Sequence, residues 1–237
     1  MTRKLKWLVF TAFILPVTFA NAQEEAGALV KKLSAKIDQV NNYVAEGRMK
    51  TNVTFLRVPE STVKIYFKKP NRLKIRNEKG ISFVPKGAVS INLGNILNGN
   101  DYTALDAGVD LIGKEQVRVI KLLPQDDNAD VVLSTLYIDE ANLVVKKART
   151  TTRENGSYQL EMSYGKYAAY GLPDKILFTF NTKDYKLPKG VTFDFEDGAE
   201  VKKTTPDNLK KNQGMAEISF ESYIINKGFP DAVFSTP

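Results

Sequence analysis

The sequence predicts a mainly β (α+β) protein: an open antiparallel half-barrel of about ten strands, its mouth covered by an N-terminal helix and one or two short helices. Three observations lead to this fold. Apolar and polar residues alternate with a period of two along most of the chain, which is typical of strands with one buried face. Most loops between the strands are short, which favours antiparallel neighbours. One long helix is too little to form a second layer, so the sheet must curl.

The first 22 residues have the pattern of a secretory signal peptide. Basic residues up to Lys6 precede an apolar run over residues 7–19, and Ala20 and Ala22 form a small-residue cleavage site. We therefore expect cleavage before Gln23 and a location in the periplasm. The alternative is an uncleaved membrane anchor, but the run is shorter than a membrane span requires.

Composition limits what the mature chain can do. Cleavage leaves 237 − 22 = 215 residues, and the formal net charge falls from +7 to +7 − 3 = +4, which does not indicate nucleic-acid binding. The chain has no Cys and no His, which excludes disulfides, a lipid on an N-terminal Cys, the commonest general base and the usual zinc ligands. We expect a released monomer with a single domain over residues 23–237, no cofactor and no enzymatic activity.

An amphipathic helix is expected over residues 24–46. Five apolar side chains recur at spacings of four, four, three and four along one side of it: Leu29, Leu33, Ile37, Val40 and Val44. Gly47 supplies a stop signal. We expect the first four of these side chains to face the sheet, so that the helix acts as a lid.

The clearest strand pair flanks a turn at residues 69–71. Its apolar face consists of Val63, Ile65, Phe67, Leu73 and Ile75. Its basic face consists of Lys64, Lys68, Arg72, Lys74 and Arg76, with Lys69 in the turn. A three-residue loop sets Phe67 opposite Leu73, whereas a two-residue loop would set Phe67 opposite Lys74 and mix the faces. The sequence therefore predicts the three-residue loop.

Further strands are expected at residues 49–55, 89–91, 117–123, 131–138, 143–148, 158–164, 176–180, 191–195 and 216–225. Residues 92–111 lose the alternation and are expected to form loops around a short helix, and the Pro at position 206 could open another. The apolar positions change phase after Phe220, which predicts a β-bulge near Glu221.

Two segments carry faint signals of other chemistry. The run from Asp126 to Asp130 starts like a calcium loop, but Val131 stands where the sharp-turn Gly is needed, so a hairpin turn is the preferred interpretation. Asp194 and Glu196 share a strand face, as in a carboxylate pair for glycoside hydrolysis. We interpret them instead as the outward polar face of that strand.

The basic face has two interpretations. It can be a solvated outer face that also discourages edge-to-edge pairing. It can also be an electrostatic docking surface, made by Lys64, Lys68, Arg72 and Lys74, for an acidic partner protein or anionic lipid headgroups.

In the order and spacing of four segments the chain resembles the periplasmic lipoprotein-carrier (LolA-like) superfamily. The segments are LVKKLSAKIDQVNNY, VKIYFKKPNRLKIR, STLYIDEANLVVKKARTTTRENGSYQLEMSY and GVTFDFEDGAEV, which together extend along nearly all of the mature chain. The resemblance implies an outer-membrane lipoprotein-sorting protein: an open half-barrel with a helical lid and a cavity for acyl chains. It also implies two partners, an inner-membrane ABC transporter and an outer-membrane acceptor.

Nine residues are predicted to line the acyl-chain cavity: Val63, Ile65, Phe67, Leu73, Ile75, Leu160, Phe178, Phe180 and Phe193. In family carriers, an Arg directly before the motif Pro ties the barrel to its lid. Lys69 takes that place here, and Lys lacks the planar fork of Arg. Residues 203–237 extend beyond the shortest members of the superfamily.

Three function classes follow from these observations. The first is a carrier of lipoprotein acyl chains or lipids. The second is a signalling module of the same fold that senses lipids or lipoproteins, and an anti-sigma factor as partner would distinguish it from the carrier. The third, an enzyme acting on a small lipid, is the weakest because His and Cys are missing.

Overall fold

The computed structural model describes residues 19–53, 56–57, 60–70, 72–77, 102–153, 156–181 and 213–235. These contain helices α1 (Phe19–Ile37) and α3 (Ala232–Ser235), and the 3₁₀ helix η2 (Ala168–Tyr170). The strands are β1 (Asn42–Val53), β2 (Leu56–Arg57), β3 (Ser61–Lys68), β4 (Arg72–Asn77), β5 (Tyr102–Ile112), β6 (Glu115–Pro124), β7 (Val131–Asp139), β8 (Val144–Thr152), β9 (Gly156–Ser163), β10 (Lys175–Asn181) and β11 (Gln213–Ile225).

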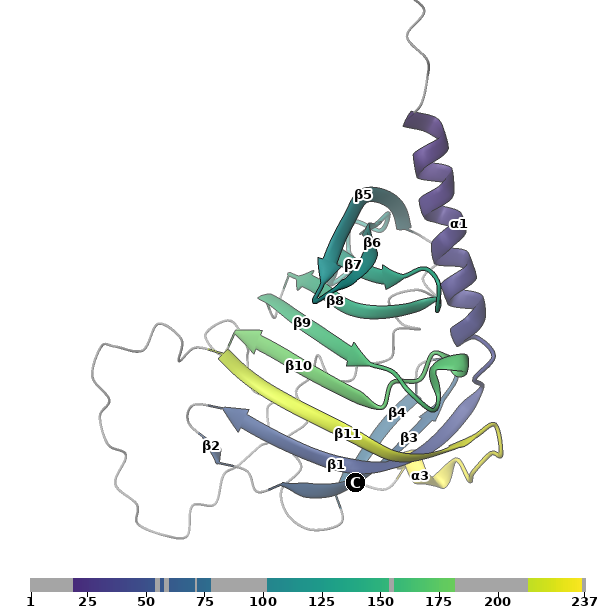
Figure 1. The fold of residues 1–237 in the computed structure, drawn as a ribbon. Helices are drawn as coiled ribbons and strands as arrows, with labels where there is room; N and C mark the ends of the chain where they lie inside the picture. The colour runs from purple at the N-terminus through teal and green to yellow at the C-terminus, as the bar shows by residue number, and fades with distance from the viewer. Residues whose placement is uncertain are drawn as a thin grey trace, which may run out of the picture.

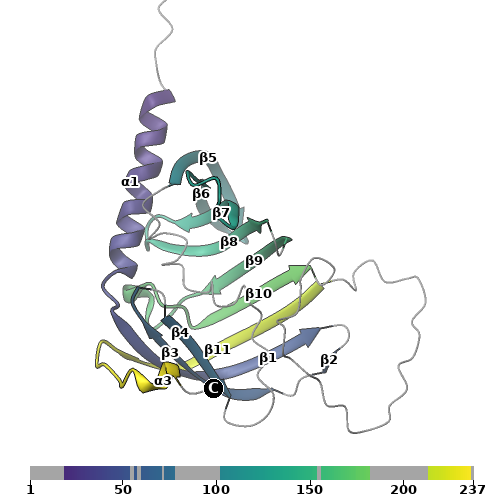
Figure 2. The same cartoon turned by 180° about the vertical axis from the view of Figure 1, so that it is seen from behind.

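The strands form one antiparallel sheet in the order β4-β3-β1-β11-β10-β9-β8-β7-β6-β5, and the short β2 pairs with β1 beside this path. The described sheet is therefore open, with β4 at one end and β5 at the other. It is strongly curved, and α1 lies along the β5–β9 side (Figure 1). Figure 2 shows from behind that β3, β4 and α3 lie at the far end from β5. The predicted fold class is confirmed.

The predicted register of the β3–β4 hairpin is also confirmed. Phe67 lies opposite Leu73, and Ile65 lies opposite Ile75. The apolar side chains of β3 are buried, while Thr62 is exposed and the later even positions are half-buried, so the two faces remain distinct.

The β1–β11 pair contains the predicted bulge. Glu46 pairs with Ser222 and Gly47 pairs with Phe220, so Glu221 is the extra residue on β11. Gly47 is required there because a Cβ atom at this position would lie 2.4 Å from the carbonyl oxygen of Ser219. Gly47 therefore permits a close approach of two strands and does not end a helix.

The predicted end of the long helix is wrong. The helix ends at Ile37, and Val44 lies in β1. Val44 fits the helical spacing of the apolar residues before it by coincidence. The residues that follow it, from Ala45 onward, alternate with a period of two, as a strand does. Pairing of β1 with both β3 and β11 favours the strand, because ladders on both sides satisfy its backbone groups.

The segment expected to form loops around a short helix contains β5. Its alternation is interrupted because a register shift falls between Asp106 and Val109 in the ladder with β6. The turn predicted near Asp126 does join β6 to β7, and the Asp126 carboxylate accepts a hydrogen bond from the Asn128 backbone at 2.9 Å.

Several predicted elements lie outside the described residues: the strands at 89–91 and 191–195, the possible helix after position 206, and the pair Asp194 and Glu196. Most of the predicted signal peptide also lies outside, although α1 already begins at Phe19, before the predicted cleavage point. Among the helices that the structure describes, none combines the length and apolar character needed to cross a membrane.

Candidate functional site

The apolar side chains of the sheet form two clusters. The helix-side cluster joins α1 to strands β5–β11, and the hairpin-side cluster joins β1, β3, β4 and β11, with Tyr167 and Leu172 on either side of η2 packed against it. Phe220 on β11 contacts both clusters. No residue of α1 belongs to the hairpin-side cluster as far as the described residues show.

The predicted cavity residues are divided between these clusters. Leu160, Phe178 and Phe180 belong to the helix-side cluster, where all three are buried. Val63, Ile65, Leu73 and Ile75 belong to the hairpin-side cluster, in which Leu73 and Ile75 are only partly buried. Phe67 is buried, with its ring centroid 5.2 Å from that of Tyr43. Phe193 lies outside the described residues.

The apolar face of α1 differs in part from the predicted one. Leu29, Leu33 and Ile37 do pack in the helix-side cluster, but Val40 is buried beyond the end of the helix. Two buried residues of this face, Ala26 and Val30, were missed. The signal was available, because Ala26, Val30, Leu33 and Ile37 follow one another at spacings of four, three and four.

Polar contacts hold α1 near both of its ends. Just after its C-terminus, the Lys69 ammonium donates to the Asp38 carbonyl at 2.5 Å and lies 2.9 Å from the Asp38 carboxylate. Near its N-terminus, Glu25 lies 3.7 Å from the Arg118 guanidinium, which also pairs with Asp106. Lys69, the predicted latch residue, thus does connect the β3–β4 hairpin to the chain at the end of the helix.

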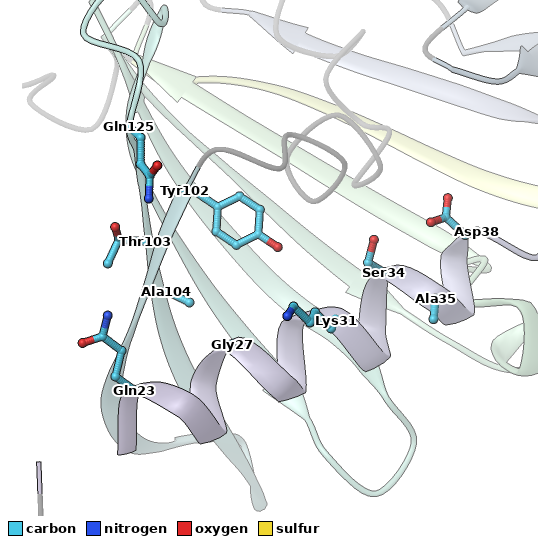
Figure 3. A pocket seen from close by; sticks show the side chains of 10 residues that line it. All are labelled: Gln23, Gly27, Lys31, Ser34, Ala35, Asp38, Tyr102, Thr103, Ala104 and Gln125. Carbon is cyan, nitrogen blue, oxygen red and sulfur yellow. The ribbon is translucent and has the colours of Figure 1, made fainter. Parts of the chain in front are cut away.

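A cavity of about 440 Å³ lies between α1 and β5. It is lined by Gln23, Gly27, Lys31, Ser34, Ala35, Asp38, Tyr102, Thr103, Ala104 and Gln125. Figure 3 shows the Tyr102 ring extending from β5 into the space beside α1, where Lys31 and Ser34 also lie. Burial raises the pKa of the Tyr102 hydroxyl above its usual value, which keeps it neutral. This cavity is a mixed polar and apolar opening next to the helix.

The predicted docking residues lie on the face of β3–β4 opposite the hairpin-side cluster. Lys64 pairs with Glu46 of β1 at 2.9 Å. Lys68 and Arg72 both contact Asp231, at 2.6 and 3.1 Å, and Lys74 lies between them and Arg76 in the ladder. The chain's own C-terminal segment, residues 228–235, therefore lies over part of this basic face, which the sequence interpretation had missed.

The arrangement just described is an open antiparallel sheet with an amphipathic helix against its apolar side. No protein-family model and no curated protein matches this chain. Solved structures do match it. A putative outer membrane lipoprotein-sorting protein domain from Vibrio parahaemolyticus aligns with a TM-score of 0.57 at 9% identity, covering 90% of this chain and 97% of that chain.

Two further structures share the architecture. A DUF1329-family protein from Desulfovibrio piger aligns with a TM-score of 0.56 at 11% identity, covering 90% of this chain and 97% of that one. A LolA-superfamily protein from Nitrosomonas europaea aligns with a TM-score of 0.50 at 11% identity, covering 87% and 97%. The chain therefore has the LolA-like fold, and the predicted resemblance is confirmed for the fold.

Proposed function

We propose that this protein is a periplasmic carrier that binds the acyl chains of lipoproteins, or of lipids, and delivers them toward the outer membrane. The main support is the apolar surface of the hairpin-side cluster, where Tyr43, Leu73 and Ile75 remain only partly buried and no α1 residue takes part among the described residues. The proposal is also supported by the fold, which this protein shares with a putative outer membrane lipoprotein-sorting protein domain. The proposed activity is binding and involves no catalytic residue.

The expected binding energy is sufficient for capture. Burying an acyl chain gains about 0.8 kcal/mol per methylene, so a partly inserted chain could gain roughly 8 kcal/mol before ordering costs. In this proposal the acyl chain first contacts Leu73 and Ile75. These two side chains lie next to the buried Val63, Ile65 and Phe67. Movement of α1 would extend the surface toward Leu160, Phe178 and Phe180, which the helix-side cluster otherwise buries.

The contact of Lys69 with Asp38 fits the role of a latch in such a cycle. It joins the end of β3 to the turn after α1, so breaking it would loosen the helix without disturbing a strand ladder. Both side chains are partly exposed, and ion pairs of this kind are worth only about 0–1 kcal/mol. A latch of this strength would open readily when a ligand competes.

The proposed cycle also needs export and two membrane partners. We propose that residues 1–22 are a cleaved signal peptide, that an inner-membrane ABC transporter loads the carrier, and that an outer-membrane acceptor unloads it. Intact-mass measurement of the protein from the periplasmic fraction tests the first step, with an N-terminus at Gln23 as the expected result.

The test of binding is native mass spectrometry with lipid extraction on the purified protein. We expect lipid to co-purify with the wild type and to be largely lost in Ile75→Glu, because a carboxylate would then face the acyl chain. Ile224→Glu is the matched control, since Ile224 lies on the same sheet but is 56% exposed. Absence of lipid from the wild type, together with no uptake of a fluorescent acyl probe, would refute the carrier proposal.

A further inference from the structure

The C-terminal segment makes specific contacts with the basic face of the β3–β4 hairpin. The Asp231 carboxylate bridges Lys68 and Arg72, and the Arg72 guanidinium lies 4.1 Å from the centroid of the Phe234 ring. Phe229 packs edge-on against Tyr66 with 5.4 Å between ring centroids. The Arg76 guanidinium also donates a hydrogen bond to the Val233 carbonyl at 3.1 Å, so the segment engages four residues of the hairpin.

A built turn directs the segment onto this face. Asn226 and Gly228, which follow β11, both have positive φ angles, of 56° and 73°. The Asn226 side-chain oxygen accepts a hydrogen bond from the Asn41 backbone at 2.7 Å, and the Gly228 backbone donates to the Asn42 side chain at 2.8 Å. The chain therefore reverses at a fixed position beside β1 and returns across β3 and β4, as Figures 1 and 2 show for α3.

The segment beyond the turn is lightly held. It adds no strand to the sheet, and α3 is a single four-residue turn. Asp231 is exposed, and Phe229 and Phe234 are only half-buried. Exposed ion pairs and exposed cation–π contacts are individually weak in water. Another ligand with the same chemistry could therefore displace it.

We infer that the basic face of the β3–β4 hairpin is a docking site for an acidic peptide segment with flanking aromatic residues, and that residues 228–235 occupy this site as an internal competitor. The seated segment itself shows what the face recognises: a carboxylate between Lys68 and Arg72, and a ring beneath the Arg72 guanidinium. This inference does not depend on acyl-chain binding, because the hairpin-side cluster lies on the opposite face.

The contacts favour a peptide over a membrane surface. An anionic lipid headgroup could replace the Asp231 carboxylate, but it offers no ring for Arg72 or for Tyr66. A peptide supplies both kinds of group at a fixed spacing, as the segment does with Phe229, Asp231 and Phe234.

The test measures binding of a dye-labelled peptide with the sequence GFPDAVFS, residues 228–235, to the purified protein. The double variant Asp231→Asn/Phe234→Ala should release the internal segment, so the peptide should bind it about tenfold more tightly than wild type if the segment normally occupies the site nine-tenths of the time. Adding Arg72→Glu to the double variant should abolish this binding, and raising the salt concentration should weaken it.

Two controls keep the inference falsifiable. A peptide with Lys in place of Asp should not bind the double variant, and far-UV circular dichroism should show that each variant is folded. A second readout avoids the double variant altogether: because the chain has no Cys, Ser235→Cys carries a single dye, whose mobility should rise when unlabelled peptide is added in excess.

Two outcomes would overturn the inference. In the first, the peptide fails to bind the folded double variant, or it binds equally well when Arg72→Glu is added. The other is binding of the double variant to vesicles containing phosphatidylglycerol but not to the peptide, which would assign the basic face to a membrane surface.

Discussion

In the helix-side half of the sheet, α1 inserts Val30 and Leu33 into a cluster that also buries Phe178 and Leu160 completely or nearly so. In the hairpin-side half, the apolar face keeps Leu73 and Ile75 partly buried, and the opposite face is covered in part by a short segment held by Asp231. Among the described residues, one half therefore resembles an ordinary packed core. The other half combines buried residues such as Val63 and Ile65 with the partly buried Leu73 and Ile75, and carries a weakly held segment on its opposite face.

This difference suggests a division of roles within one continuous sheet: the helix-side half provides stability, and the hairpin-side half is available for binding. Because β10, β11 and β1 connect the halves by backbone ladders, the helix-side core can hold the hairpin-side strands in place. The hairpin-side half can then exchange its cover without unfolding, since ion pairs and half-buried rings contribute far less than a buried cluster. Mutations in the two halves should accordingly have different consequences.

The largest expected difference concerns truncation of apolar side chains. Phe178→Ala removes a ring that is 1% exposed and packs against Tyr158 and Phe180, so it should lower the free energy of unfolding by about 3–5 kcal/mol. Leu73→Ala in the hairpin-side half should cost less than about 2 kcal/mol because the side chain is only partly buried. Urea denaturation of both variants measures this, and equal losses would contradict the division into two kinds of half.

Sequence reasoning succeeded where local patterns decide the structure. The alternation on both sides of residues 69–71 was enough to predict the register of β3 and β4, and the phase change after Phe220 was enough to predict the bulge at Glu221. It failed at Val44, where helix and strand periods overlap and pairing with two neighbouring strands decides. It also failed at β5, whose irregular ladder hides the alternation.

The candidate site depended more on tertiary contacts. The sequence identified Lys69 as a possible latch, but Asp38 as its partner follows only from where α1 ends relative to the hairpin. Likewise, the basic face was evident from the sequence, whereas its contact with Asp231 joins residues more than 150 positions apart. The division of the predicted cavity residues into two clusters arises from where α1 lies on the sheet.

A smaller effect is expected at the contact that joins the two halves. Lys69→Met removes the hydrogen bond and ion pair to Asp38, which should weaken docking of the end of α1 by about 0.2–1 kcal/mol. Hydrogen exchange in the last turn of α1 should then be up to about fivefold faster, while Lys69→Arg should exchange nearly as slowly as wild type. Unchanged exchange in Lys69→Met would show that the contact between Lys69 and Asp38 does not hold the end of the helix.

The smallest expected effect is confined to the segment on the basic face and depends on pH. Hydrogen bonds from Lys68 and then Arg72 hold the pKa of the Asp231 carboxyl below its ordinary value of 3.8. Because the pKa is lower when the segment is docked than when it is released, these contacts favour docking fully above pH 3.8. Docking of the segment should begin to weaken as the pH falls below 3.8, and this contribution should be lost once the pH has fallen through the lower pKa of the docked state.

A dye on Ser235→Cys should therefore become more mobile in this acid range, before far-UV circular dichroism reports any loss of secondary structure. Asp231→Asn removes the titrating group and should give a dye that is mobile at every pH down to the same range. If the two proteins showed the same pH profile, the carboxylate bridge would not be what holds the segment, and the rings of Phe229 and Phe234 would have to account for its position.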